Sequence, residues 1–127
     1  MVKKDNSLRY RLYNAILRDN DLIVKSPATI SKSGKTAQIT KDNGLRVEIR
    51  IGMLVRILVK ISLPDHKVQI RYTYAIGKID IVDQEIRVKV PEKVKLPKNK
   101  EYSVVLPEHS IIQKPTFWHW LKNKIIS

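Results

Sequence analysis

Residues 45–63 read LRVEIRIGMLVRILVKISL, and this stretch decides how the rest of the chain is expected to fold. Every odd position in it is apolar, and most even positions carry a charged or polar side chain. Such alternation is typical of a β-strand with one face on a core and the other toward water. The charged even positions are mostly basic: Arg46, Glu48, Arg50, Arg56 and Lys60. We therefore expect a β-rich protein with a basic sheet face.

Gly52 interrupts this stretch without changing the parity of its apolar residues. The segment Ile51-Gly52-Met53 is therefore either a bend in one continuous strand or a short loop between two strands. Because apolar residues make poor turns, we predict one strongly bent strand with glycine at the bend. Leu54 and Leu58 are apolar positions on the basic face. They indicate that this face is covered beyond Gly52, by a terminal helix or by another subunit.

Neighbouring segments are predicted to join this strand as antiparallel hairpins whose register follows from the alternation. A three-residue loop at 42–44 pairs Ile39 with Val47 and keeps the apolar residues on one side. A four-residue loop at 64–67 likewise pairs Ile61 with Ile70. A four-residue loop at 82–85 also keeps the apolar residues of its two strands on one side. The apolar parity changes near Gly77, which predicts a turn or a bulge there.

The fold class that these patterns predict is mainly β (α+β) in one domain, residues 1–127. Residues 22–106 are expected to form an antiparallel meander of about six or seven strands, as a strongly bent sheet or small open barrel. Tyr72, Tyr74 and Tyr102 share the apolar parity and are predicted to lie in its core.

Two helices are expected to flank the sheet. Residues 5–18 have apolar side chains at helical spacing and a capping Asp, Asn or Ser at the start. The arginines of this helix either remain solvated or contact phosphate. Residues 115–126 begin with a proline suited to the first turn of a helix and carry Trp118 and Trp120 on a broad apolar face. This second helix either closes the open side of the sheet or docks onto a partner chain.

The chain is strongly basic, with 25 Lys and Arg against 12 Asp and Glu and a formal net charge of +13. Both halves share the excess, so the charge belongs to the folded body. A field of this sign favours polyanions, nucleic acid first, although the same charge also serves solubility. Cysteine is absent, which excludes a disulfide framework and thiolate metal sites.

The N-terminus lacks the apolar core of a signal peptide, and no stretch is apolar enough for a transmembrane segment. We therefore expect a cytoplasmic protein. The abundance of Ile, Val and Lys is also typical of heat-adapted proteins.

The strongest candidate site is a set of cations on the water-facing side of the predicted sheet and in the loop that follows it. Regularly spaced cations on a rigid surface suit a nucleic-acid backbone. The basic face carries almost no aromatic rings, which favours phosphate contacts on a duplex or on structured RNA over base stacking, with duplex DNA as the preferred ligand. The nucleic-acid-binding residues that we predict are Arg46, Arg50, Arg87, Lys89, Lys93, Lys95, Lys98 and Lys100.

Catalytic chemistry finds little support in the sequence. His66, His109 and His119 show no metal-ligand spacing, and the serines lie outside any nucleophile motif. We predict a non-enzymatic protein without a catalytic, metal or cofactor site. The alternative function is that of a structural or assembly protein, a homo-oligomer or a partner-docking module, which uses the C-terminal helix or a sheet edge.

Overall fold

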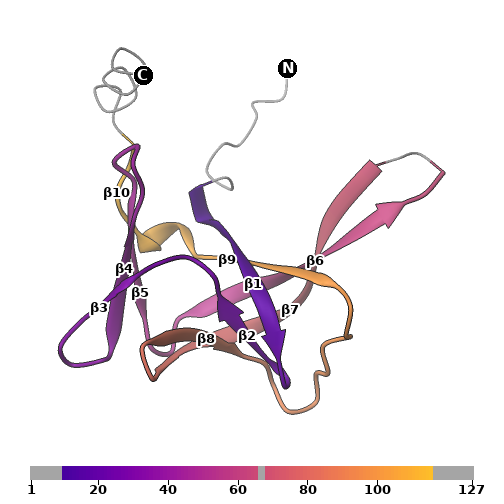
Figure 1. Cartoon of the computed structure of the whole chain (residues 1–127), viewed down its shortest axis with the longest axis horizontal. Helices are drawn as coiled ribbons and strands as arrows, with labels where there is room; N and C mark the ends of the chain where they lie inside the picture. The colour runs from indigo at the N-terminus through magenta and orange to yellow at the C-terminus, as the bar shows by residue number, and fades with distance from the viewer. Residues whose placement is uncertain (1–9, 66–67, 116–127) are drawn as a thin grey trace.

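The computed structural model describes residues 10–65 and 68–115, whose regular elements are ten strands and one 3-10 helix (Figure 1). The elements in chain order are β1 (Leu12–Arg18), β2 (Asp21–Val24), β3 (Thr29–Ile30), β4 (Thr36–Thr40), β5 (Arg46–Arg50), β6 (Leu54–Leu63), β7 (Val68–Val82), β8 (Glu85–Lys89), β9 (Glu101–Val105), η1 (Glu108–Ser110) and β10 (Ile111–Gln113). No helix in these described ranges has the length and apolar character needed to cross a membrane.

Six of the strands close into an antiparallel barrel in the order β1-β2-β8-β7-β6-β9. Closure depends on β9, which pairs with β6 along one edge and with β1 along the other. The predicted open meander over 22–106 is therefore wrong. Alternation along each strand identifies which face is buried, but it carries no information on which distant strands become neighbours.

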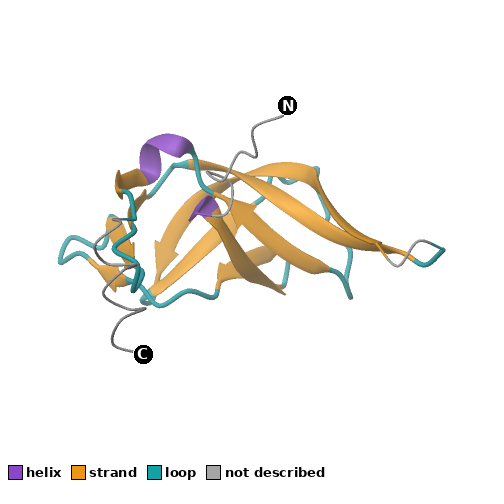
Figure 2. Ribbon diagram, turned by 90° about the horizontal axis from the view of Figure 1, so that it is seen from above, coloured by secondary structure: helices purple, strands orange, loops and turns teal. Residues whose placement is uncertain are grey.

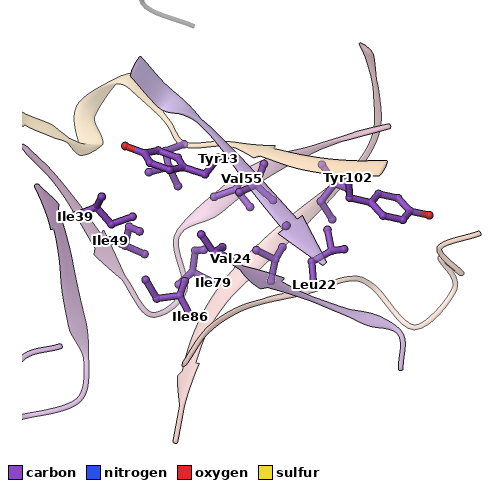
Figure 3. Packing of buried hydrophobic residues seen from close by; sticks show 14 of the residues in the cluster. Tyr13, Leu22, Val24, Ile39, Ile49, Val55, Ile79, Ile86 and Tyr102 are labelled. Atoms are coloured by element: carbon purple, nitrogen blue, oxygen red, sulfur yellow. The ribbon is translucent and has the colours of Figure 1, made fainter. Parts of the chain in front are cut away.

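The remaining strands form a second sheet in the order β10-β5-β4-β3, which stands at one end of the barrel (Figure 1). Backbone hydrogen bonds join the two parts where Gly52 N–H donates to Ile79 O at 2.8 Å and Ile79 N–H donates to Met53 O at 2.8 Å. One hydrophobic cluster is continuous across both sheets, with Ile39 and Ile49 on the side of the small sheet and Tyr102 at the far end (Figure 3).

The hairpin registers that alternation predicts are confirmed. Ile39 pairs with Val47, and Ile61 pairs with Ile70. The third hairpin also has its predicted pairing, with a tighter turn in which Asp83 and Gln84 both adopt positive φ. Positive φ at both central residues is the geometry of a type I′ turn, whose twist matches that of the strands.

The prediction of one bent strand over 45–63 is wrong, because the chain turns at Ile51-Gly52 and enters a different sheet. Met53 N–H donates to Arg50 O at 3.1 Å, and Gly52 adopts a φ of +90°. A four-residue turn with positive φ at its third residue strongly favours glycine there, whatever the polarity of its neighbours. The backbone requirement therefore outweighs the poor turn propensity of Ile51, which remains exposed.

The predicted N-terminal helix over 5–18 is also wrong for its described part, because Leu12–Arg18 form β1. Helical backbone in the described ranges is confined to residues 10–11 and the 3-10 helix η1. Tyr13 and Ala15 are buried on the barrel side, whereas Asn14 and Ile16 are exposed. Pairing on both edges, with β2 and β9, outweighs the local helical spacing. The predicted C-terminal helix at 115–126 lies outside the described residues, apart from Pro115.

A long hairpin of β6 and β7 projects beyond the barrel (Figure 2). The pairing of β6 with β9 stops at Lys60, and the pairing of β7 with β8 begins only at Lys78. Between these limits no other strand of the described ranges pairs with the hairpin, and Tyr72 and Tyr74 are exposed, so their predicted core position is wrong. Tyr102, by contrast, is buried as predicted.

The change of parity near Gly77 has a structural cause a few residues earlier in β7. The register of β6 and β7 shifts between Ile57 and Leu58, where Tyr74 is the extra residue on β7. This is a β-bulge, one of the two predicted outcomes. Gly77 itself lies within the strand, packed so closely that a Cβ atom there would be 2.3 Å from Val88 Cγ1 and 2.9 Å from Ile57 Cδ1.

We predict that Gly77→Ala destabilises the protein by about 1–3 kcal/mol, because the added methyl group overpacks the barrel core. Gly52→Asn is the matched change in open space, since asparagine tolerates positive φ and no atom lies within 4 Å of the Cβ position. The midpoint and slope of urea unfolding give the free energy of unfolding of both variants. Equal stability of Gly77→Ala and the native protein would contradict the packing described here.

We further predict a loss of stability at alkaline pH that depends on Tyr13. Burial raises the pKa of Tyr13 from 10.0 to about 12, and its hydroxyl has no hydrogen-bond partner among the described residues. The contribution of Tyr13 to the free energy of unfolding is intact below about pH 10. It is lost between about pH 10 and pH 12, at up to about 1.4 kcal/mol per pH unit, because Tyr13 ionises in that range only in the unfolded chain.

Urea unfolding at increasing pH tests this, with Tyr13→Phe as the variant and Tyr72→Phe at an exposed position as the control. Tyr13→Phe should flatten the alkaline decline, and the residual slope should include Tyr102, whose pKa burial also raises. Parallel declines in the native protein and Tyr13→Phe would refute the assignment.

Candidate nucleic-acid interface

The eight predicted nucleic-acid-binding residues fall into three groups on different elements. Arg46 and Arg50 belong to β5 in the small sheet, and Arg87 and Lys89 belong to β8 in the barrel. The other members lie in the segment between β8 and β9, on the opposite side of the barrel from the small sheet (Figure 1): Lys93, Lys95, Lys98 and Lys100. The structure therefore does not bring all eight into one surface.

The small-sheet pair is engaged with neighbouring side chains. Arg46 Nη2 donates to Gln38 Oε1 at 2.8 Å, across the β4–β5 pair. Arg50 Nη2 lies 2.7 Å from Glu48 Oε1 on the same strand. Arg50 is thus partly compensated by an acid beside it, which weakens its field toward a phosphate.

The β8 pair is compensated more completely. Glu85 accepts from Arg18 at 2.9 Å and lies 3.4 Å from Arg87, and these contacts, the Arg18 hydrogen bond first, lower its pKa below the ordinary value. Lys89 Nζ lies 3.3 Å from Asp80 Oδ2 on β7. Arg87 is also half-buried, so this part of the barrel is a mixed-charge surface.

The segment 90–100, here called the lysine loop, differs from both. Its four lysines are all exposed, and within the described ranges none forms an ion pair. Glu92 is the acid that the loop itself contains. The segment 93–100 therefore places four exposed cations within eight residues, none of them in an ion pair with a described residue.

The lysine loop is held to the barrel by buried groups. Leu96 is 6% exposed and packs in the hydrophobic core. On either side of it, Asn20 bridges the loop: its Nδ2 donates to Val94 O at 2.9 Å, and its Oδ1 accepts from Leu96 N–H at 3.0 Å. Asn20 follows β1, so the same asparagine fixes the loop to the first hairpin.

Two tyrosine hydroxyls fix the loop from the other side. Tyr74 donates to Lys95 O at 3.1 Å, and Tyr102 donates to Pro97 O. The lysine Cα positions are therefore fixed by hydrogen bonds and by Leu96, while the ammonium groups remain free to meet a ligand. A binding surface fixed in this way loses less conformational entropy when a ligand binds.

Beside the loop, an open hollow of about 750 Å³ adds one further cation, Arg71. Its lining includes Lys98, Lys100 and Arg71, together with Asn14 and Ile16 of β1. Two acids, Asp19 and Glu101, also line the hollow, and Glu101 Oε2 lies 3.3 Å from Lys60 Nζ. Arg71 is exposed and forms no ion pair within the described ranges, so it extends the positive surface of the loop across the sheet.

The sequence carries no functional signal for Asn20, its alternation wrongly predicted Tyr72 and Tyr74 to lie in the core, and Arg71 was left outside the predicted set. Arg71 had the right parity and could have been included. Asn20 sits in a polar Asp-Asn-Asp run that resembles any turn, and its contacts lie 74 and 76 residues away. Only the tertiary structure identifies it.

The described residues contain no group of three or more metal-ligating side chains. His109 is exposed at η1, whereas His66 and His119 lie outside the described residues. Two carboxylates in this part of the barrel, Asp80 and Glu85, are each engaged with basic side chains. The chemistry that this surface offers is the binding of anions.

We predict that Asn20→Ala releases the lysine loop. The substitution removes two hydrogen bonds and leaves Leu96 N–H and Val94 O unpaired, at a cost of about 1–3 kcal/mol. Asn20→Asp retains the acceptor for Leu96 but loses the donor to Val94, so its effect should be smaller. Amide hydrogen exchange at Leu96 measures the release, and the exposed Asn14→Ala is the control. Unchanged protection of Leu96 in Asn20→Ala would show that the loop is held by other means.

Comparisons with known proteins supply no identity for the chain. No protein-family model matches it, and neither the search of curated proteins nor the search of solved structures found a match. The function must therefore be argued from the surface just described.

Proposed function

We propose that this protein is a non-enzymatic nucleic-acid-binding protein that contacts phosphates through the lysine loop and Arg71. The observation that carries the proposal is the set of four exposed, uncompensated lysines on a loop that the barrel holds in place. Lysine ammonium groups pair with phosphate as point charges and need no particular base sequence.

The charge of the whole chain supports the same partner. A formal charge of +13 attracts polyanions over distances of about one Debye length, roughly 8–10 Å at physiological salt. Each neutralised phosphate releases condensed counterions, which makes binding fall steeply as salt rises. Lysines at 93, 95, 98 and 100 allow several such contacts from one short segment.

The proposed site contains only part of the set of eight nucleic-acid-binding residues predicted from the sequence. Lys93, Lys95, Lys98 and Lys100 remain and are joined by Arg71. Arg87 and Lys89 are paired with acids, and Arg46 and Arg50 lie on the small sheet, so these four are at most secondary contacts. The small-sheet pair thus provides a control surface on the same molecule.

A second candidate is an assembly module, favoured by the exposed edge of β7. Within the described ranges residues 68–77 have no neighbour on the side where β8 pairs later, and Val68, Ile70 and Ile76 are exposed. Long apolar edges pair readily with another strand. Sedimentation equilibrium without nucleic acid separates the two functions, because only the assembly module self-associates by itself.

We predict that replacing Lys93, Lys95, Lys98 and Lys100 with glutamine weakens nucleic-acid binding and lowers its dependence on salt. In plots of log K against log salt, the slope should become shallower by about 0.9 on duplex DNA, or about 0.7 on a single strand, for every phosphate that the variant no longer neutralises. Fluorescence anisotropy with labelled oligonucleotides over a salt series measures both quantities.

The matched control replaces Lys32, Lys35, Arg46 and Arg50 with glutamine, which removes the same formal charge from the small-sheet side. This variant should retain most of the affinity and nearly the full slope. Equal reductions in both variants would mean that the charge acts as a whole, and the lysine loop would not be the site. A native protein that binds neither DNA nor RNA would overturn the proposed function.

A further inference from the structure

Two aromatic rings are exposed beside the lysine loop. Tyr72 is 44% exposed and Tyr74 is 37% exposed, and both lie on β7 before its pairing with β8 begins at Lys78. Tyr74 reaches the loop directly, through its hydrogen bond to Lys95 O. The expectation of a duplex ligand depended on a basic surface without rings, and that condition does not hold here.

The two rings are two residues apart on β7, beside the β-bulge. Val59 pairs with Tyr72 on the inward side of the sheet, and Tyr74 is the extra residue that follows. Both tyrosines lie close enough to Tyr102 to help raise its pKa, although burial is the larger cause. Three tyrosines therefore gather around residues 95–97, with Tyr102 buried and the other two open to solvent.

We infer that the ligand of this site is single-stranded nucleic acid, whose unpaired bases stack on Tyr72 and Tyr74 while its phosphates contact the lysine loop. This inference rests on the proposed function. Alternation of rings and cations is the arrangement that single-strand binders use, and each base–ring contact contributes about 5- to 150-fold in affinity. A duplex has its base faces stacked internally and cannot use the exposed rings.

The two rings have different roles beyond stacking. Tyr74 also holds the loop through its hydroxyl, so its removal would disturb the lysines as well. The Tyr72 hydroxyl makes no hydrogen bond within the described part of the chain, and its ring is the more exposed. Tyr72 is therefore the residue at which stacking can be tested without releasing the loop.

The experiment measures binding of the full chain to labelled oligo(dT), oligo(U) and a DNA duplex of equal length, for the native protein, Tyr72→Leu and Tyr72→Phe. We expect single strands to bind more tightly than duplex. Tyr72→Leu should bind the single strands about 5- to 150-fold more weakly and keep its salt slope, whereas Tyr72→Phe should bind like the native protein. Leu54→Ala, at an exposed apolar position away from the loop, is the control for a change of surface hydrophobicity.

A second measurement needs no variant. The ring proton resonances of Tyr72 should shift upfield when oligo(dT) is added and should remain in place when duplex is added. Equal or tighter binding to duplex, or unchanged single-strand affinity in Tyr72→Leu, would overturn the stacking inference. The proposed phosphate contacts would survive that result if the lysine-to-glutamine variant still bound more weakly, whereas absence of all binding would remove both.

Discussion

The structure depends on the double pairing of β9, the strand that closes the barrel. β9 pairs with β6 and with β1, so both of its edges are determined by other strands. Its five residues contain four that are buried, including Tyr102 and Val104. The lysine loop leads directly into β9, and closure of the barrel therefore determines where the loop must run.

The surface proposed to bind nucleic acid follows from this closure. Between the end of β8 and the start of β9, the chain crosses the mouth of the barrel, where Leu96 is inserted into the core. Asn20 and two tyrosine hydroxyls satisfy backbone groups of the loop. A segment with this many lysines would lose considerable entropy if it were ordered only by its ligand. Here the barrel supplies that order beforehand, while the exposed side chains keep their solvation.

The pairing of neighbouring segments could be predicted from the sequence, because alternation and turn length together determine the register. The registers of Ile39 with Val47 and Ile61 with Ile70 follow from local pattern alone. The turn at Gly52 could not be resolved, since its signal is a backbone angle and not a polarity. The exposure of Tyr72 and Tyr74 was equally beyond reach, because it depends on where β8 and β9 stop pairing with their neighbours.

The candidate site could be predicted only in part, because the positions of the cations can be read from the sequence but their ion pairs cannot. Lys93, Lys95, Lys98 and Lys100 are visible as a run of charge, but their lack of counter-ions is a tertiary property. Arg87 and Lys89 looked equivalent to them until Glu85 and Asp80 were placed beside them. The sequence shows where cations are, and only the fold shows which of them are compensated.

Pairing of the first and last barrel strands has a consequence for how the molecule assembles. Where β1 and β9 meet, Arg11 and Leu106 contact one another across 95 residues of chain, through their backbone and through the Arg11 guanidinium. Contacts of such long sequence separation carry a large loop-closure entropy and slow the folding of β-barrels. The local hairpins can form early, whereas β9 and the loop before it acquire their positions only when β9 pairs with β1 and closes the barrel. The surface proposed to bind phosphate would then be completed at the end of folding, so that a partly folded chain lacks the complete proposed site.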